Sequence, residues 1–338
     1  MGCSNEAWSR GRGRGEGIVD NRRTGRPCDK CGSRDRCGVR YDPPSFIVCY
    51  KVSSHEHTAD GGFIHRLDAA SAAALPVVAL APSVERAPDA ALDRAYRAML
   101  SQLGLSSAHR AALLARGLDV RAIERAGYAS LEVAGRAKLG RAIVEAVGED
   151  LAARVPGYVV RSSEGRSWPS VAGWPGLLVP CRDERGRILG LQVRRDEPGD
   201  GPRYVWLSSR SQGGASASTF AHVPVIAPDA RRDELLVTEG PLKSDVVTAL
   251  DGRLCVAVPG VSAWARALPV LEALRPRSVL VAFDSDVMTN PAVKLAHDAL
   301  CSALTARSIR AASLRWPPSL GKGLDDALLS QRQNGQTP

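Results

Sequence analysis

The sequence predicts an α/β fold whose carboxy-terminal part is a mostly parallel sheet with helices on both faces. Two apolar runs that end at carboxylates, Leu235–Glu239 and Ser278–Asp284, carry this prediction. A continuous apolar run is typical of a strand buried on both faces, as in a parallel sheet. Strand-like and helix-like segments alternate around these runs, which indicates repeated strand–helix–strand units. The expected elements are strands 235–239, 253–258, 278–284 and 309–316 and helices 241–250, 262–274 and 291–307.

Glycine and proline mark the boundaries of these elements. Gly252 and Gly260 flank strand 253–258, where glycine is expected at a change of chain direction. Pro291 suits the first turn of helix 291–307, with Asn290 before it as a possible cap.

Three carboxylates end two of the predicted strands: Glu239, Asp284 and Asp286. Ligands of parallel sheets bind at the carboxyl ends of the strands, so these acids are expected to meet at one site. They would repel one another without a divalent cation between them, and hard oxygen ligands favour Mg²⁺ or Mn²⁺. Because residues two apart on a strand share a face, Asp284 and Asp286 are suited to one ion.

Glu239-Gly240 and Asp284-Ser285-Asp286, in this order and at strand ends, resemble the signature of the TOPRIM domain of bacterial-type primases, topoisomerases and some nucleases. Residues 230–330, about a third of the chain, resemble more closely a poorly characterised TOPRIM-like family, of the DUF3854 kind, found in phage, plasmid and other mobile-element proteins. The resemblance implies a Rossmann-like parallel sheet. The motifs that carry it are Glu239–Lys243, Val258–Trp264, Ala282–Asp286, Asn290–Val293 and Gly321–Asp326.

The chain departs from the replicative primases at Lys243, where they commonly carry another acid. Lys243 is expected either to bind phosphate as a point charge or to be a solvated helix residue. Asp325 and Asp326 follow the last strand and either supply the missing carboxylate or only begin a short helix. Lys322, in the same segment, is a candidate for nucleotide binding.

Four cysteines near the amino terminus have the spacing C-x2-C-x5-C-x11-C: Cys28, Cys31, Cys37 and Cys49. A CxxC turn suits two thiolates on one tetrahedral structural Zn²⁺. The disulfide alternative needs an oxidising compartment, and no secretory signal is visible. Histidines close behind, at positions 55, 57 and 65, are alternatives to Cys49 as the last ligand.

A zinc ribbon ahead of a TOPRIM domain is the order seen in bacterial-type primases, in which the ribbon contacts the template strand. Between the two, strand-like runs 176–183, 188–195 and 203–208 predict a small antiparallel subdomain. A similar subdomain helps to form the catalytic cleft of primases. Arg194, Arg195 and Arg203 are therefore candidates for nucleotide or template phosphates, the alternative being that two of them are solvated edge charges.

Composition bounds the organisation of the chain. It has 338 residues, is 44% hydrophobic and carries a net charge of +9, which suits a polyanionic partner but also reflects its general richness in arginine. No apolar run approaches a membrane span, and a cytoplasmic location is expected. The predicted divisions are a basic tail at 1–26, the ribbon at 27–67, a linker at 68–90, a helical segment at 91–156, the antiparallel subdomain at 157–229 and the TOPRIM-like domain at 230–330.

The resemblance implies a primase-like nucleotidyltransferase of a mobile element that joins nucleoside triphosphates into short primers on single-stranded DNA. Asp284 and Asp286 would hold Mg²⁺, and Glu239 would act as a general base or as a further ligand. No phosphate-binding loop of a helicase motor is present, so any helicase would be a separate partner. The alternatives are a TOPRIM metal-dependent nuclease and a catalytically inactive single-strand-binding replication adaptor. A topoisomerase is less favoured, because no nucleophilic tyrosine lies beside the acids.

Overall fold

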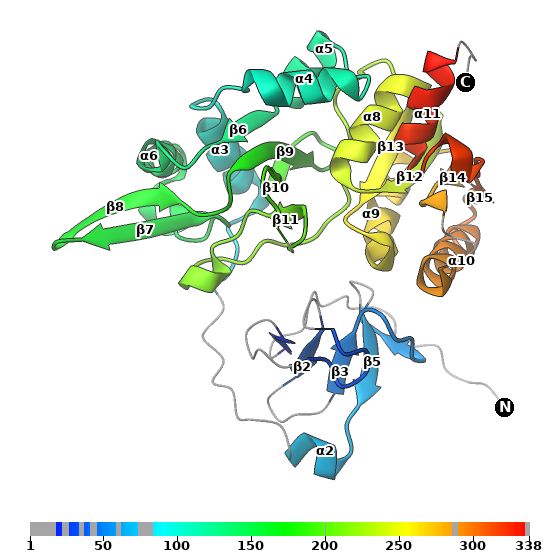
Figure 1. Cartoon of the computed structure of the whole chain (residues 1–338), viewed down its shortest axis with the longest axis horizontal. Coiled ribbons are helices and arrows are strands. Elements are labelled where there is room, and N and C mark those ends of the chain that lie inside the picture. The colour runs from blue at the N-terminus through cyan, green and yellow to red at the C-terminus, as the bar shows by residue number, and fades with distance from the viewer. Residues whose placement is uncertain are drawn as a thin grey trace.

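The structure is a computed structural model that describes residues 18–21, 27–33, 37–40, 46–58, 62–73, 84–199, 201–285 and 290–334 (Figure 1). It is a mixed α/β molecule with a parallel sheet, a smaller antiparallel sheet and an amino-terminal cysteine cluster. Among these residues, no helix combines the length and the apolar character that crossing a membrane requires.

The amino-terminal part is a small antiparallel sheet with strand order β1-β2-β3-β5-β4. Its apolar interior is minimal and contains Val39, Ile47 and three of the four clustered cysteines. A sheet with so small a core depends on a further source of stability, such as a metal ion. The elements are β1 (Ile18–Asp20), β2 (Gly38–Arg40), β3 (Phe46–Cys49), β4 (Glu56–His57), β5 (Phe63–Arg66) and the short helix α2 (Ala69–Ala73).

Five helices lie between Asp89 and Ala152, where the sequence analysis expected a helical segment at 91–156. Helix α4 begins where the Ser106 hydroxyl accepts the His109 N–H at 3.2 Å, and α5 begins where Asp119 accepts the Ala122 N–H at 2.6 Å. Gly127, at φ 70°, ends α5 in the left-handed conformation that favours glycine. The helices are α3 (Asp89–Leu100), α4 (Ser107–Ala115), α5 (Val120–Ala126), α6 (Arg136–Val147) and α7 (Glu149–Ala152).

A four-stranded antiparallel sheet has the order β11-β10-β9-β6. The three strands expected from the sequence are present, and β6, which the sequence analysis did not predict, pairs with β9. A separate hairpin, β7 with β8, extends away from the body of the molecule (Figure 1). The strands are β6 (Ala129–Leu131), β7 (Tyr158–Ser163), β8 (Arg166–Val171), β9 (Gly176–Arg182), β10 (Ile188–Arg195) and β11 (Tyr204–Trp206).

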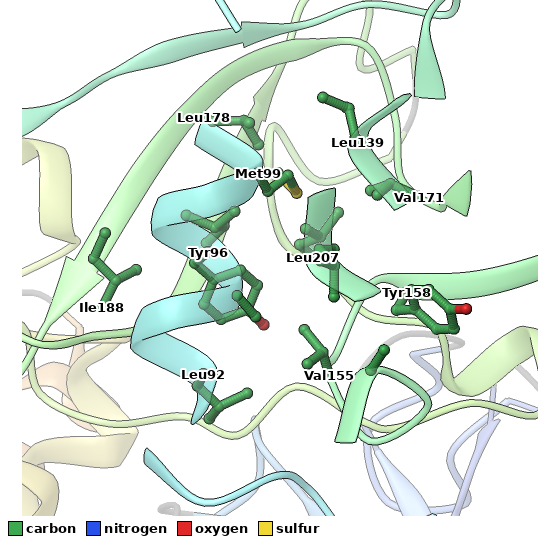
Figure 2. Close-up of a cluster of buried hydrophobic side chains, with 14 of the residues drawn as sticks. Leu92, Tyr96, Met99, Leu139, Val155, Tyr158, Val171, Leu178, Ile188 and Leu207 are labelled. Carbon is green, nitrogen blue, oxygen red and sulfur yellow. The ribbon is translucent and has the colours of Figure 1, made fainter. Parts of the chain in front are cut away.

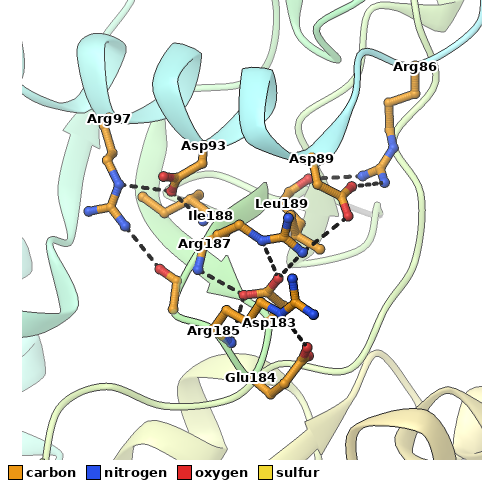
Figure 3. A network of polar contacts seen from close by, with 11 residues as sticks. Arg86, Asp89, Asp93, Arg97, Asp183, Glu184, Arg185, Arg187, Ile188 and Leu189 are labelled. Atoms are coloured by element: carbon orange, nitrogen blue, oxygen red, sulfur yellow. Dashed lines mark hydrogen bonds and ion pairs between the residues drawn. The ribbon is translucent and has the colours of Figure 1, made fainter. Parts of the chain in front are cut away.

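Helix α3 is fixed to the antiparallel sheet by an apolar cluster and by a polar one. Leu92, Tyr96 and Met99 on its inner face are fully buried against side chains of α6, β9 and β10 (Figure 2). On its other side, Asp93 accepts the Ile188 N–H at 2.7 Å, and Arg187 contacts both Asp183 and Asp89 (Figure 3).

The carboxy-terminal part is a parallel sheet of order β13-β12-β14-β15. Its neighbouring strands are in register, with Glu239 opposite Val258 and Val237 opposite Val281. The strands are β12 (Arg231–Glu239), β13 (Arg253–Val258), β14 (Ser278–Val281) and β15 (Arg310–Ser313), and the helices are α8 (Pro241–Asp251), α9 (Ala267–Leu274), α10 (Pro291–Thr305) and α11 (Leu324–Gln333).

Alternate residues of β12 face opposite layers of helices. Leu236 belongs to an apolar cluster with residues of α8 and α11, whereas Leu235 and Val237 belong to a cluster with residues of α9 and α10. Both faces of the sheet are therefore covered, as Figure 1 shows. The first cluster also contains Leu113, Leu118 and Ile123, so the α4–α5 unit lies against the same face as α8.

Three expected boundaries are corrected. The strand expected at 278–284 ends at Val281, because the Asp284 N–H bonds to the Glu239 side chain instead of continuing the strand ladder. The helix expected at 262–274 begins as a 3-10 turn over Val261–Arg266. The strand expected at 309–316 covers only Arg310–Ser313.

Candidate active site and cysteine cluster

A cavity of about 1170 Å³ lies at the carboxyl ends of the parallel strands. Its lining includes seven of the candidate residues: Glu239, Lys243, Asp284, Arg203, Lys322, Asp325 and Asp326. Tyr50, His55 and Phe63 of the amino-terminal sheet also line it. The cavity therefore brings together side chains of the parallel, antiparallel and amino-terminal sheets.

Glu239 and Asp284 meet because they follow the adjacent strands β12 and β14. The backbone N–H of Asp284 donates to Glu239 Oε1 at 3.1 Å. Beneath them, the Thr238 hydroxyl donates to the Ala282 carbonyl at 3.0 Å and holds the two strand ends together. The sequence analysis placed these two acids at one site, and the structure brings them together. Asp286 lies outside the described residues.

Lys243 is paired with an acid and largely buried. Its Nζ forms an ion pair with Asp284, and only 17% of the lysine side chain is exposed. Burial alone would lower the pKa of Lys243, but the charges of Glu239 and Asp284 outweigh it, and the pKa is raised. Lys243 is therefore a fixed ammonium inside the acidic site rather than a solvated helix residue.

Lys322 reaches the same carboxylate from outside. Its Nζ lies 3.8 Å from Asp284 Oδ2, and its side chain is 64% exposed. The backbone carbonyl of Lys322 accepts the Ser285 N–H at 3.0 Å. This contact folds the segment before α11 back over the end of β14.

Asp325, in the first turn of α11, is 3% exposed and lines the cavity. One of its oxygens, Oδ2, pairs with Arg116, whereas the buried Oδ1 has no hydrogen-bond partner. Burial raises the pKa of Asp325, and the nearby charges of Arg116 and Lys243 oppose that rise only in part. Asp326 also lines the cavity.

Arg116 lines the cavity, but the sequence analysis did not name it as a functional candidate. It follows α4 and lies 209 residues before its partner Asp325 in the sequence. In the sequence it is only a basic residue before Gly117. Such a signal does not reveal which carboxylate the side chain will meet.

The three candidate arginines of the antiparallel sheet differ in their position relative to the cavity. Arg203 lines the cavity, whereas Arg194 and Arg195 are not among the described residues of its lining. Arg195 instead stacks on Trp174, with its guanidinium carbon 4.3 Å from the ring centre, and donates to the carbonyls of Glu197 and Pro202.

The acidic site fits a hard divalent cation. Its donors are carboxylate oxygens, the type of ligand that Mg²⁺ and Mn²⁺ prefer. Glu239 and Asp284 are the described acids that meet at the strand ends, whereas the described carboxylates do not bring three ligand oxygens within 4.8 Å of one another. These two could hold the ion, Asp286 lies outside the described residues, and Asp325 lines the same cavity.

The four cysteines form a second site. The sulfur atoms of Cys28, Cys31, Cys37 and Cys49 all lie within 4.8 Å of one another. The Cys31–Cys37 and Cys37–Cys49 sulfur distances are 3.5 and 3.9 Å. They agree with the separation of about 3.8 Å that a tetrahedral ion with 2.3 Å zinc–sulfur bonds requires. They are far longer than a disulfide of about 2.05 Å.

Backbone donors and burial act in opposite directions on the cysteines of the cluster. The backbone N–H groups of Lys51 and Val52 donate to Cys49 Sγ at 3.4 and 3.2 Å. Without an ion, burial raises the pKa of both Cys37 and Cys49, so a bound cation is needed to keep these thiols ionised. Of the histidines considered as substitutes, His65 bonds to the Val52 carbonyl and His55 lines the cavity. The side chain of His57 lies outside the described residues.

Comparison with known proteins agrees with this architecture. Residues 230–335 match a family described as "Domain of unknown function (DUF3854)". No curated protein matches the chain. The crystal structure of the Aquifex aeolicus primase, comprising zinc binding and RNA polymerase domains, is similar with a TM-score of 0.54 and 15% identity, over 72% of this chain and 60% of that one.

Two structures of the RNA polymerase domain of the Mycobacterium tuberculosis primase DnaG are also similar. The first has a TM-score of 0.55 and 17% identity, over 73% of this chain and 82% of that one. The second, in complex with a double-stranded DNA oligomer with a 6-nucleotide overhang, has a TM-score of 0.54 and 18% identity, over 73% and 80%. The fold is primase-like. At these identities the likeness concerns the fold, and this chain spans 60% of the length of the Aquifex structure.

Proposed function

We propose that this chain is a primase-like nucleotidyltransferase with a TOPRIM-like catalytic domain. It joins nucleoside triphosphates into short primers on single-stranded DNA in a reaction that depends on Mg²⁺ or Mn²⁺. The TOPRIM-like family that residues 230–330 resemble occurs in phages, plasmids and other mobile elements. We therefore assign the activity to the replication of such an element, beside a separate helicase.

One observation carries the proposal. Glu239 and Asp284 converge at the end of a parallel sheet, in a cavity whose wall also contains the cations Arg203 and Lys322. Carboxylates that hold a metal and cations that bind phosphate are the two requirements of nucleotidyl transfer, which depends on positioning and on charge stabilisation.

The residues divide the work as follows. Asp284, with the predicted ligand Asp286, holds the metal, which when bound stabilises negative charge on the triphosphate. Glu239 accepts the proton of the attacking 3′-hydroxyl or serves as a further ligand. Arg203 and Lys322 bind phosphate oxygens of the incoming nucleotide. Arg194 and Arg195, outside the described lining of the cavity, are left to the phosphates of the template.

The cysteine cluster supports the template part of the proposal. We propose that it holds one structural Zn²⁺ and that the amino-terminal sheet presents the template strand to the cavity. Tyr50 and Phe63 of this sheet line the cavity. Aromatic side chains in such positions can stack on unpaired bases.

The test is an incubation of the zinc-loaded chain with labelled nucleoside triphosphates, single-stranded DNA and Mg²⁺ or Mn²⁺, followed by a denaturing gel. We expect short products from the wild type and a loss of at least about 100-fold in Asp284→Asn. Asp233→Asn is the matched control, because Asp233 is 60% exposed at the opposite end of β12. Cut template without new products would indicate the nuclease instead.

A second candidate is a catalytically inactive single-strand-binding adaptor. The ion pair of Lys243 with Asp284 favours it, because an ammonium on that carboxylate competes with a metal ion. Template binding without products or cleavage, and equal behaviour of wild type and Asp284→Asn, would make this candidate the better one.

A further inference from the structure

Lys243 occupies a place among carboxylates rather than at their edge. Its ammonium pairs with Asp284, and the charges of Glu239 and Asp325 also act on it. One cation that the chain itself supplies is therefore paired with Asp284 and lies in the field of two further acids, Glu239 and Asp325. A second protein cation, Arg116, neutralises the outer oxygen of Asp325.

The wall of the site is shaped around this lysine. A side chain at Gly323 would have its Cβ 3.1 Å from Lys243 Cε and 3.3 Å from Nζ, and it would clash with Asp325 Oδ1. Glycine at this position leaves the lysine and the Asp325 carboxylate in their present places. Two separate segments thus determine the position of the ammonium: α8 carries Lys243, and the loop before α11 provides the space beside it.

The acids nevertheless retain capacity for an ion. Among the described residues, the buried Asp325 Oδ1 has no hydrogen-bond partner, and Asp325 lines the cavity. Of the Asp284 oxygens, Oδ1 pairs with Lys243, whereas Oδ2 lies 3.8 Å from the exposed Lys322. Room for one further cation therefore exists beside the ammonium.

We infer that the Lys243 ammonium takes the place of a second divalent cation, so that this site binds a single Mg²⁺ or Mn²⁺. This inference rests on the metal site of the proposed function and specifies its stoichiometry. The fixed charge supplies part of the neutralisation that two metal ions would otherwise give, and it requires no ion from solution.

The test counts Mn²⁺ bound to the zinc-loaded full chain without nucleotide, from the electron paramagnetic resonance signal of free Mn²⁺. We expect one ion in the wild type. Lys243→Met keeps the bulk of the side chain without its charge, and it should bind one ion about tenfold more tightly. Lys243→Asp should bind two. Lys294→Met is the matched control, since that lysine is exposed and pairs with Asp298 of its own helix, and we expect one ion with a change in affinity under about threefold.

Two ions in the wild type, or one ion in a folded Lys243→Asp, would overturn the inference. If Lys243→Asp fails to fold, Lys243→Met decides alone, and an affinity equal to that of the wild type overturns it. If no variant bound Mn²⁺, the acidic site would not be a metal site, and the inference would fail with it. The count is read without primer synthesis, so one ion in a chain that makes no primers would reject the proposed activity and leave the inference standing.

Discussion

At the scale of single residues, a buried polar chain joins the antiparallel sheet to α8. His222 Nδ1 accepts the Arg182 backbone N–H at 2.9 Å, so its ring proton is on Nε2, which donates to Asp245 at 3.2 Å. The Tyr128 hydroxyl donates to the other oxygen of Asp245. Burial and the Asp245 charge raise the pKa of Tyr128, so the hydroxyl keeps its proton. These bonds fix the helix that carries Lys243.

Removing the Tyr128 hydroxyl is expected to lower the free energy of unfolding more than removing a buried hydroxyl that bonds to a neutral acceptor. Tyr128→Phe leaves a buried carboxylate oxygen without its donor, and we expect a loss of about 2 kcal/mol in the free energy of unfolding. Tyr96→Phe is the matched control, because the buried Tyr96 hydroxyl donates to the Pro156 carbonyl at 3.0 Å; we expect about 1 kcal/mol there. Urea unfolding followed by circular dichroism measures both, and an equal or smaller loss at Tyr128 would contradict the expected order.

At the scale of elements, the sequence predicts strands where the apolar signal is continuous and misses them where it is not. β12 contains the apolar run Leu235–Val237 and β13 the run Leu254–Val258, and a strand was expected at each; β12 begins at Arg231, four residues earlier than expected, because its charged start carries no apolar signal. The β7–β8 hairpin was missed because its strands are rich in serine and arginine and β8 contains Pro169. Its turn, Glu164-Gly165, has positive φ at both residues, which is the two-residue hairpin geometry that the sequence analysis overlooked.

Helix α6 lies against this hairpin, and Gly140 marks their closest backbone approach among the described glycines. A Cβ on Gly140 would lie 2.5 Å from the Pro169 carbonyl carbon and 2.7 Å from Ser170 Cα, so the helix rests directly on the backbone of β8. Gly140→Ala should therefore lower the free energy of unfolding by about 2 kcal/mol, although alanine is the better helix former. Gly104→Ala, where the added Cβ meets open space, should change it by less than about 0.5 kcal/mol. Thermal unfolding measures both variants. If Gly140→Ala were more stable than the wild type, the helix and the hairpin would not be in this contact.

At the scale of the whole molecule, local sequence identifies several candidate site residues but not how the site is assembled. Glu239, Asp284 and the cysteines belong to motifs with short spacings, so local sequence identifies them. The pair of Arg116 with Asp325 joins residues 209 positions apart, and only the packing of α4–α5 against the α8 face brings them together. Nor does local sequence distinguish Arg203, which lines the cavity, from Arg195, which stacks on Trp174.

The amino-terminal sheet and the acidic site share one cavity, but their metal sites are separate. We therefore expect the doubly substituted Cys28→Ser, Cys31→Ser chain to lose its zinc and the order of the amino-terminal sheet. Its Mn²⁺ count at the acidic site should remain that of the wild type. Zinc analysis by mass spectrometry and hydrogen exchange measure these outcomes, with Cys181→Ser as the control outside the cluster.

The wild type should retain zinc less well as the pH falls. Burial raises the pKa of Cys37 and Cys49 in the metal-free chain, so zinc must displace protons from these thiols, and each proton added favours release. If the amino-terminal sheet presents the template, zinc loss also weakens single-stranded DNA binding, by about tenfold or more in fluorescence anisotropy at fixed salt. Zinc retention that does not change between pH 8 and pH 5 would argue against thiolate ligation. Unchanged DNA affinity in the double variant would instead place template binding on the antiparallel sheet alone.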